Sequence, residues 1–286
     1  MGLDIHALNF LLIYKSKKLK DTVTIGRQSL HLEEDTLRQF IELKSNYKHN
    51  LFCEELLKKY FNAKKVDSID ISAFEEATII HDMNQIIPKK YHQKFDTVIN
   101  YGSLEHIFNF PVAIMNCSLM LKPGGQIFHI LPANNFCGHG FYQFSPELFS
   151  SLYNKKNGYA QTDIFIGDLS DYKNIYKVKI KKRHRINIMS KNETNLFVRT
   201  IKNKNFSHSN IQQISYLDEW SKSNYKEKYK INLSQYQKIK IKLKNINILY
   251  NILKPFYEFL KALKLKNELS YNSNLIKIEL KKYIKK

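Results

Sequence analysis

Residues 95–146, FDTVINYGSLEHIFNFPVAIMNCSLMLKPGGQIFHILPANNFCGHGFYQFSP, decide the fold. Phe95, Val98 and Ile99 predict a short buried strand, which ends on the polar group Asn100-Tyr101-Gly102. A helix is predicted from about residue 104 to residue 120. The Lys-Pro-Gly-Gly turn at residues 122–125 stops it, and residues 126–131 form a second apolar strand. This order of elements predicts one half of an open, mostly parallel α/β sheet.

The ends of these two strands are the first candidate site. In open α/β sheets, ligands bind beyond the carboxyl ends of the strands. Asn100 and Tyr101 stand at one such end, and Pro132 follows the other. We therefore expect Asn100 and Tyr101 to face a bound ligand.

Three pieces of this stretch, in this order, resemble the later half of a class I S-adenosylmethionine-dependent methyltransferase. They are the strand ending at Asn100, the Leu-Glu-His tract at residues 104–106 and the Leu-Lys-Pro-Gly-Gly turn at residues 121–125. The resemblance implies a Rossmann-like, mostly parallel sheet with helices on both faces. It also implies S-adenosyl-L-methionine as the cofactor, methyl transfer as the activity, and antiparallel strands at the end of the domain.

The upstream half departs from this family pattern at its first loop. A predicted strand at residues 22–25 leads into Gly26, Arg27 and Gln28. The family usually has a glycine-rich loop here, because the backbone must approach the cofactor closely. We expect a modified loop in which Arg27 or Gln28 binds the methionine carboxylate. The alternative is an ordinary strand-to-helix turn that has lost cofactor binding.

Two aspartates follow the next two predicted strands. Asp70 and Ile71 end the strand at residues 66–71, and the resemblance implies that Asp70 accepts hydrogen bonds from the ribose hydroxyls. Residues 32–63 must then form an enlarged helical crossover. A third strand, residues 77–82, ends at Asp82. The resemblance places Asp82 on the adenine amino group and Met83 against the ring.

Candidate catalytic residues lie at His106 and in residues 134–144, NNFCGHGFYQF. A hydroxyl acceptor needs a general base, and histidine titrates near neutral pH. His106 follows the tip at Asn100, and His139 lies between two glycines in a loop rich in aromatic residues. We expect His106, His139 and Tyr142 to serve acceptor binding or deprotonation, with Gln143 as a further contact. For each histidine, a structural role in ordering its loop stays open.

Composition limits the other classes of protein. Hydrophobic residues make up 43% of the 286 residues, which is enough for a folded core. The three scattered cysteines fit a reducing cytoplasm and form neither a disulfide framework nor a zinc motif. No metal is expected, because no histidine or carboxylate pair has ligand spacing on one element. The apolar run at residues 8–14 is too short to span a membrane.

The net charge of +20 belongs to the end of the chain. Residues 1–170 contain 18 Lys+Arg and 18 Asp+Glu, whereas residues 171–286 contain 28 and 8. We predict a methyltransferase-like domain over residues 1–203, beginning with a helix within residues 1–20. Residues 204–286 are predicted to form a basic, mainly helical extension, including helices at residues 233–254 and 274–284. Three roles for it stay open: accessory packing, contact with the inner face of a membrane, and nucleic-acid binding.

The sequence thus favours a cytoplasmic methyltransferase that acts on a hydroxyl of a small molecule or glycan. One alternative is a catalytically silent binding or scaffold protein, which the Gly26-Arg27-Gln28 loop would explain. Another is an RNA methyltransferase. The sequence lacks an Asn/Asp-Pro-Pro-aromatic motif after the fourth strand, and this disfavours methylation of a base amino group.

Overall fold

The computed structural model describes residues 2–180, 186, 188–203, 206–207, 211–213, 251, 253–260 and 268–284. Most of the helix expected at residues 233–254 lies outside the described residues.

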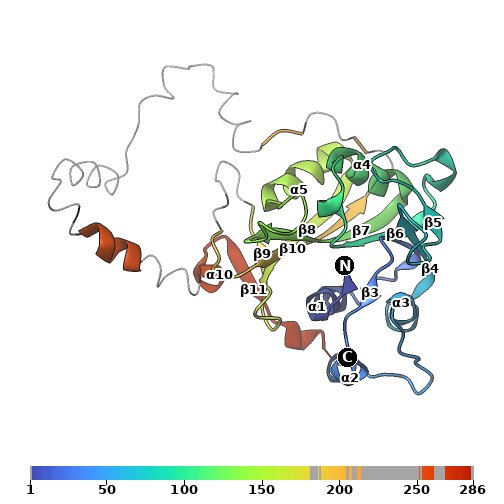
Figure 1. Ribbon diagram of the computed structural model, residues 1–286, viewed down its shortest axis with the longest axis horizontal. Coiled ribbons are helices and arrows are strands. Elements are labelled where there is room, and N and C mark those ends of the chain that lie inside the picture. The colour runs from blue at the N-terminus through green and yellow to red at the C-terminus, as the bar shows by residue number, and fades with distance from the viewer. Residues whose placement is uncertain are drawn as a thin grey trace.

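A nine-stranded sheet organises the fold, in the order β11-β9-β8-β10-β7-β6-β2-β4-β5 (Figure 1). Neighbouring strands are parallel from β7 through β5, and β10 is antiparallel to both β7 and β8. The five parallel strands have the doubly wound order of nucleotide-binding folds. The predicted parallel sheet and its late antiparallel strands are confirmed. The bounds are β2 Lys20–Ile25, β4 Ala63–Asp70, β5 Ile79–Ile80, β6 Phe95–Tyr101, β7 Leu121–Asn134, β8 Tyr159–Asp168, β9 Ile175–Val178, β10 Thr194–Lys202 and β11 Leu275–Ile278.

Helices cover both faces of this sheet, as predicted (Figure 1). On one face lie α4 (Phe110–Met120) and α5 (Pro146–Leu152), and on the other lie α1 (Ile5–Ile13), α2 (Glu34–Phe40) and α3 (Glu54–Tyr60). The last two make up the helical crossover expected between the first two strands. A small parallel pair, β1 (Gly2–Leu3) and β3 (Ser29–Leu30), joins the N-terminus to the loop after β2.

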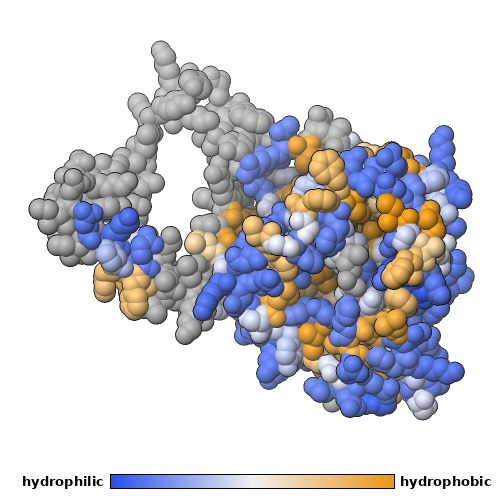
Figure 2. Space-filling view, viewed as in Figure 1, coloured by the Kyte–Doolittle hydropathy of each residue, from blue (hydrophilic) through white to orange (hydrophobic). Residues whose placement is uncertain are grey.

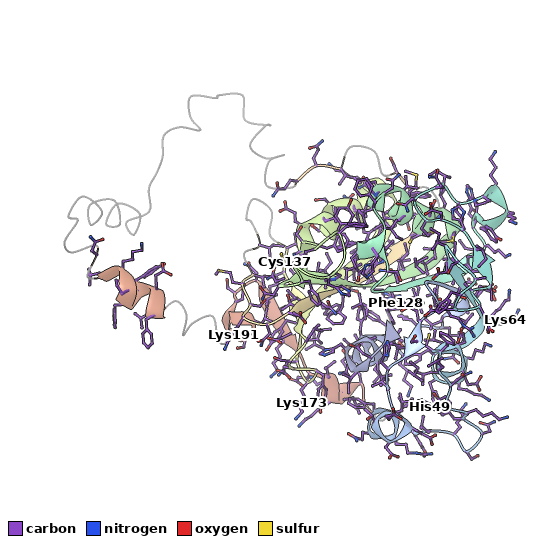
Figure 3. The ribbon with its side chains drawn as sticks, viewed as in Figure 1. His49, Lys64, Phe128, Cys137, Lys173 and Lys191 are labelled. Carbon is purple, nitrogen blue, oxygen red and sulfur yellow. The ribbon has the colours of Figure 1, made fainter. Side chains whose placement is uncertain are left out.

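The apolar run near the N-terminus is the centre of one half of the core. Asp4 caps α1 by accepting a hydrogen bond from the Ala7 N–H at 2.8 Å. The Phe10 ring then packs edge-on against Phe128 at 5.6 Å and Phe197 at 5.5 Å between centroids. Figure 3 shows Phe128 in the middle of the sheet. Among the described residues, no helix has the length and apolar character to cross a membrane.

The helix expected to begin near residue 104 begins later. Residues Leu104–His106 form a 3₁₀ turn, η2, and α4 starts at Phe110. Pro111 explains the difference, because a proline inside a continuous helix would leave the Ile107 carbonyl without its donor. In the first turn of α4 that missing N–H costs nothing.

Two other expectations are also corrected. The third strand is only Ile79–Ile80, and it ends before Asp82. The segment expected as a helix at residues 274–284 contains β11, which pairs antiparallel with β9. Leu275 and Ile278 are half-buried and Ile276 and Lys277 are exposed, and the two β-branched isoleucines suit a strand at the edge of the sheet. The predicted extension therefore contributes a strand to the sheet, while the division at residue 203 stays a prediction.

Candidate functional site

The carboxyl ends of β2, β4, β6 and β7 bring the predicted site residues to one edge of the sheet. Strand register places Ile25 beside both Ile69 and Asn100, and it places Tyr101 beside Ile130. The loops that follow these strands therefore share that edge. The loops after β2, β6 and β7 carry Gly26, Glu105 and His139, and Asp70 is the last residue of β4.

Gly26 has a backbone conformation that favours glycine, as expected in a cofactor-binding loop. Its φ of 73° lies in the left-handed region, which favours glycine. Its N–H donates to the carbonyl oxygen of Ile69 at 2.8 Å, which ties the loop after β2 to the end of β4.

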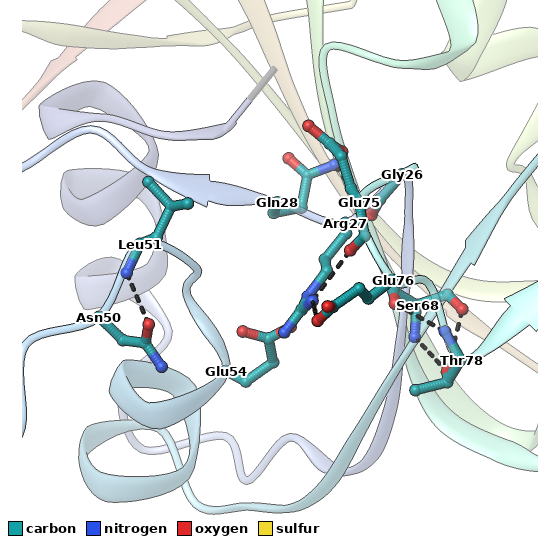
Figure 4. A network of polar contacts seen from close by, with 10 residues as sticks. All are labelled: Gly26, Arg27, Gln28, Asn50, Leu51, Glu54, Ser68, Glu75, Glu76 and Thr78. Atoms are coloured by element: carbon teal, nitrogen blue, oxygen red, sulfur yellow. Dashed lines mark hydrogen bonds and ion pairs between the residues drawn. The ribbon is translucent and has the colours of Figure 1, made fainter. Parts of the chain in front are cut away.

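Arg27 is held by the protein's own carboxylates (Figure 4). Its guanidinium pairs with Glu54 at 2.8 Å and Glu76 at 3.3 Å, and it lies 3.9 Å from the centroid of the Phe52 ring. It also donates to the backbone oxygen of Glu75 at 2.9 Å. The guanidinium thus bridges the loops after β2 and β4, and its predicted contact with the methionine carboxylate stays a prediction.

Gln28 is buried at the base of the same loop. Its side-chain NH₂ donates to the carbonyl oxygen of Ile25 at 2.6 Å. Ser103 donates its hydroxyl to that same oxygen at 2.5 Å, so the ends of β2 and β6 are joined here. The Oε1 atom of Gln28 has no hydrogen-bond partner among the described residues, which leaves a buried acceptor at the predicted site.

The two predicted site aspartates, Asp70 and Asp82, differ in their surroundings. Asp70 is half-buried at the end of β4, and its Oδ1 accepts from the Ser72 N–H at 3.1 Å. Asp82 accepts from the backbone and side chain of Asn84, and these hydrogen bonds lower the pKa of its carboxyl. Ile71 is exposed, whereas Met83 is buried in the core. The roles assigned to these four residues stay predictions.

The tip of β6 contains buried polar side chains. Asn100 Oδ1 accepts from the N–H groups of Ser103 at 3.2 Å and Leu104 at 3.1 Å. Asn100 Nδ2 and the Tyr101 hydroxyl have no hydrogen-bond partner in the part of the chain that the structure describes. Burial raises the pKa of the Tyr101 phenol well above its usual value.

Glu105, His106 and His139 form the main ionisable cluster at this edge. The Glu105 side chain is 2% exposed, and its Oε1 lies 3.7 Å from Nε2 of His139. The rings of His106 and His139 meet edge to face at 4.9 Å between centroids. Burial raises the pKa of Glu105 to about 7, and burial together with the neighbouring His139 lowers the pKa of His106.

The loop after β7 is fastened directly onto Glu105. The Phe141 N–H donates to the Glu105 carbonyl oxygen at 2.7 Å. Gly140 makes this approach with a φ of 72°, and a Cβ at this position would lie 2.9 Å from the same oxygen. Tyr142 donates its hydroxyl to the Phe108 carbonyl oxygen at 2.6 Å. This hydrogen bond fixes the loop after β7 to the segment between η2 and α4. The catalytic role of Tyr142 stays a prediction.

A small cavity of about 150 Å³ borders this cluster. Glu105 and His139 line it together with Tyr101 and with Asp4 from the N-terminus. It has room for a few waters or a small chemical group, and it is smaller than a typical pocket for a whole cofactor. Sequence reasoning missed Glu105 as a site residue. Its place in the Leu-Glu-His tract was the available signal.

Comparisons with known proteins return solved structures alone. No family model and no curated protein matches the chain significantly. The N-methyltransferase NodS from Bradyrhizobium japonicum WM9 is 14% identical, with a TM-score of 0.38, over 70% of this chain and 94% of that one. A 1,6-didemethyltoxoflavin-N1-methyltransferase from Burkholderia thailandensis, solved with bound 1,6-didemethyltoxoflavin and S-adenosylhomocysteine, is 9% identical. The match has a TM-score of 0.39 and covers 71% of this chain and 80% of that one.

Likenesses at this identity and TM-score do not assign an activity to the chain. The strand order and the late antiparallel strand are properties of this structure itself. The chain therefore has the doubly wound α/β fold with late antiparallel strands that its sequence predicts.

Proposed function

We propose that this protein transfers a methyl group from S-adenosyl-L-methionine to a hydroxyl of a small molecule or glycan. One observation carries the proposal: the carboxyl edge of the parallel sheet divides into two parts. Gly26, Gln28 and Asp70 stand at the ends of β2 and β4, and the Glu105, His106 and His139 cluster stands after β6 and β7. The first part suits a nucleoside cofactor and the second suits an acceptor.

The residues of the first part fit the cofactor chemically. A carboxylate at the end of β4 is placed to accept hydrogen bonds from a ribose diol, and Asp70 supplies it. The methionine end carries an ammonium and a carboxylate, which require an acceptor and a donor. Gln28 Oε1 and Asn100 Nδ2 are a buried acceptor and a buried donor without partners among the described residues. Cofactor binding would satisfy both atoms, which are otherwise costly to bury.

The second part fits the acceptor chemistry. The acceptor oxygen attacks the methyl carbon of the sulfonium, the carbon–sulfur bond breaks, and S-adenosylhomocysteine leaves as a neutral thioether. The hydroxyl proton must pass to a base. His106 follows β6 and His139 follows β7 in this part of the edge, and the Glu105 carboxyl lies 3.7 Å from His139. Methyl transfer otherwise depends mainly on alignment, which the Phe141–Glu105 hydrogen bond supports.

The activity test is release of S-adenosylhomocysteine from S-adenosylmethionine with a panel of free sugars, glycosides and small phenols. We expect turnover with a hydroxyl acceptor and its loss in His139→Ala. Cofactor binding without turnover on any acceptor in the panel would contradict the proposed acceptor class. Turnover on RNA instead would favour the alternative of a nucleic-acid methyltransferase.

We also propose that the basic extension contacts an anionic membrane surface. Residues 253–260 are helical, and their apolar side chains gather on one side of that helix (Figure 2). Phe256 is 61% exposed and Phe259 is 59% exposed. Apolar side chains beside an excess of lysines suit the interface of a membrane with acidic lipids. Flotation of the full chain with anionic vesicles at low salt tests this, and absence from the lipid fraction would contradict it.

A further inference from the structure

Three side chains with metal-binding atoms converge at the acceptor end of the edge. One ligand atom each from Glu105, His106 and His139 lies within 4.8 Å of the others. Glu105 and His106 are neighbours on the turn η2, and His139 comes from the loop after β7. We propose that these three residues bind one divalent transition-metal ion.

The geometry needs only small movements of exposed side chains. Zinc binds imidazole nitrogen and carboxylate oxygen at about 2.0–2.2 Å, so tetrahedral ligand atoms lie roughly 3.4 Å apart. The distance from Glu105 Oε1 to His139 Nε2 is already 3.7 Å. His106 and His139 are both exposed, so rotation about their side-chain bonds can close the remaining gap. Glu105 is the fixed member, because its side chain is 2% exposed.

A second, independent observation also indicates a ligand at this place. Glu105 Oε2 is buried and has no hydrogen-bond partner within the described parts of the chain. Burying a carboxylate oxygen without a partner is costly, and such groups in folded proteins usually pair or bind a metal. A cation between Glu105 and the two histidines would supply the missing partner if the carboxylate binds it through both oxygens, Oε1 on the side of His139 and the unpartnered Oε2.

The backbone around the cluster is built to hold it together. The 2.7 Å hydrogen bond from Phe141 to the Glu105 carbonyl fixes the loop after β7 against η2. Tyr142 adds its bond to the Phe108 carbonyl at 2.6 Å. His139 is therefore kept beside Glu105, although 34 positions separate them in the sequence. This separation is why ligand spacing on a single element did not reveal the site.

Two imidazoles and one carboxylate select the class of metal ion. Imidazole suits Zn²⁺, Fe²⁺, Co²⁺ and Ni²⁺, whereas Mg²⁺ and Ca²⁺ prefer oxygen ligands alone. Three protein ligands leave a coordination position open, as in catalytic zinc sites. An acceptor hydroxyl bound at that position would lose its proton more readily. With the ion bound, it would activate the hydroxyl in place of a free histidine base, because the ring nitrogens of His106 and His139 would hold the ion. This last role rests on the proposed methyl transfer, and the binding of the ion does not.

The test is calorimetric titration of the full chain, freed of metal by a chelator, with Zn²⁺ and separately with Mg²⁺. We expect one equivalent of Zn²⁺ to bind and Mg²⁺ to bind far more weakly. His139→Ala and Glu105→Gln should each weaken Zn²⁺ binding by at least about 100-fold, since each removes one of three ligands and the loss of an outer-shell partner alone costs about 10–100-fold. The matched control is His49→Ala. This exposed histidine lies far from Cys137, which is two positions before His139 (Figure 3). A second readout is the visible absorption of Co²⁺ bound in place of Zn²⁺.

The outcomes separate this proposal from the proposed function. Zn²⁺ binding that is equal in wild type and His139→Ala, or no binding in wild type, would overturn the metal site. Far-UV circular dichroism and S-adenosylhomocysteine binding of each variant show whether it is folded with its cofactor part intact. A chain that binds Zn²⁺ through these residues but binds no S-adenosylhomocysteine keeps the metal site and loses the methyltransferase proposal.

Discussion

The Phe141 N–H donates to the Glu105 carbonyl oxygen at 2.7 Å. This bond joins the loop after β7 to the turn after β6, and the two loops carry His139 and His106. The proposed acceptor part depends on this junction, because neither loop alone brings both histidines to the Glu105 carboxylate.

Gly140→Ala tests the junction. An added Cβ would lie 2.9 Å from the Glu105 oxygen, and the φ of 72° disfavours any side chain. We expect the loop to withdraw from Glu105 and turnover to fall by about 100-fold, the effect of a displacement near 1 Å. Affinity for S-adenosylhomocysteine should stay unchanged. Gly138→Ala is the matched control, since nothing lies within 4 Å of its Cβ position. Equal turnover in both variants would contradict the role of the junction.

Gln28→Met tests the buried acceptor in the first loop. The substitution keeps the volume of the side chain but removes Oε1 and the 2.6 Å bond to Ile25. We expect S-adenosylhomocysteine to bind about tenfold more weakly, which corresponds to one lost hydrogen bond to a charged group. Calorimetry measures this loss, with Gln39→Met on α2 as an exposed control. An unchanged affinity would remove Gln28 from the cofactor site.

The pair formed by Arg27 and Glu54 is expected to stabilise the first loop. Both side chains are 20% exposed, so their 2.8 Å contact is only partly screened by solvent. Arg27→Met and Glu54→Gln should each lower the free energy of unfolding by about 1 kcal/mol. A double-mutant cycle in urea measures their coupling, and fully additive effects would show that the pair does not stabilise the fold.

The burial of His129 is expected to make the stability of the fold depend on pH. Burial lowers its pKa to about 3, against about 6.5 in the unfolded chain. Between these values the unfolded chain binds a proton that the folded chain excludes. The contribution of His129 to the free energy of unfolding should therefore fall by about 1.4 kcal/mol for each pH unit below about 6.5. Glu105, whose pKa is raised to about 7, contributes a slope of opposite sign over part of this range, so the His129 slope is the difference between the wild type and a variant without this ring. Urea unfolding across this range measures the slope.

His129→Gln is the control for this slope, because it removes the titrating ring and keeps a group that can bond the Tyr153 hydroxyl. That hydroxyl lies 2.8 Å from His129 Nε2 in the wild type. The variant should lose less stability on acidification than the wild type does. Parallel pH curves for the two proteins would contradict a buried, neutral His129.

The sequence predicted the local elements whose pattern lies within a short window. Phe95, Val98 and Ile99 were sufficient to predict β6. β7 was predicted to begin at residue 126, after a Lys-Pro-Gly-Gly turn, but it begins at Leu121, so these four residues lie within the strand. The start of α4 was predicted too early, because hydrophobic spacing alone ignores the missing N–H of Pro111. β11 was predicted as helix because its pairing with β9 joins residues about 100 positions apart. Local periodicity contains no information on such a contact.

The candidate site could be predicted only in part for the same reason. Asn100, Asp70 and Gly26 could be predicted as site residues from their positions at or just after strand ends, because the carboxyl ends of parallel strands share an edge. The burial of Glu105 depends on residues 136–141 folding over it, which no local pattern shows. Arg27 was assigned to the cofactor, and its pairing with Glu54 and Glu76 became visible only once α3 and the loop after β4 were placed.

The most direct test of the central claim is calorimetric titration of the purified chain with S-adenosylhomocysteine, beside Asp70→Ala and the exposed control Asp35→Ala. We expect micromolar binding to the wild type and the control. Asp70→Ala should bind at least about tenfold more weakly, since it removes the charged acceptor for the ribose hydroxyls. No binding to the wild type at millimolar ligand would contradict the cofactor site and favour a catalytically silent scaffold. Equal binding to Asp70→Ala would contradict the assigned position of the ribose.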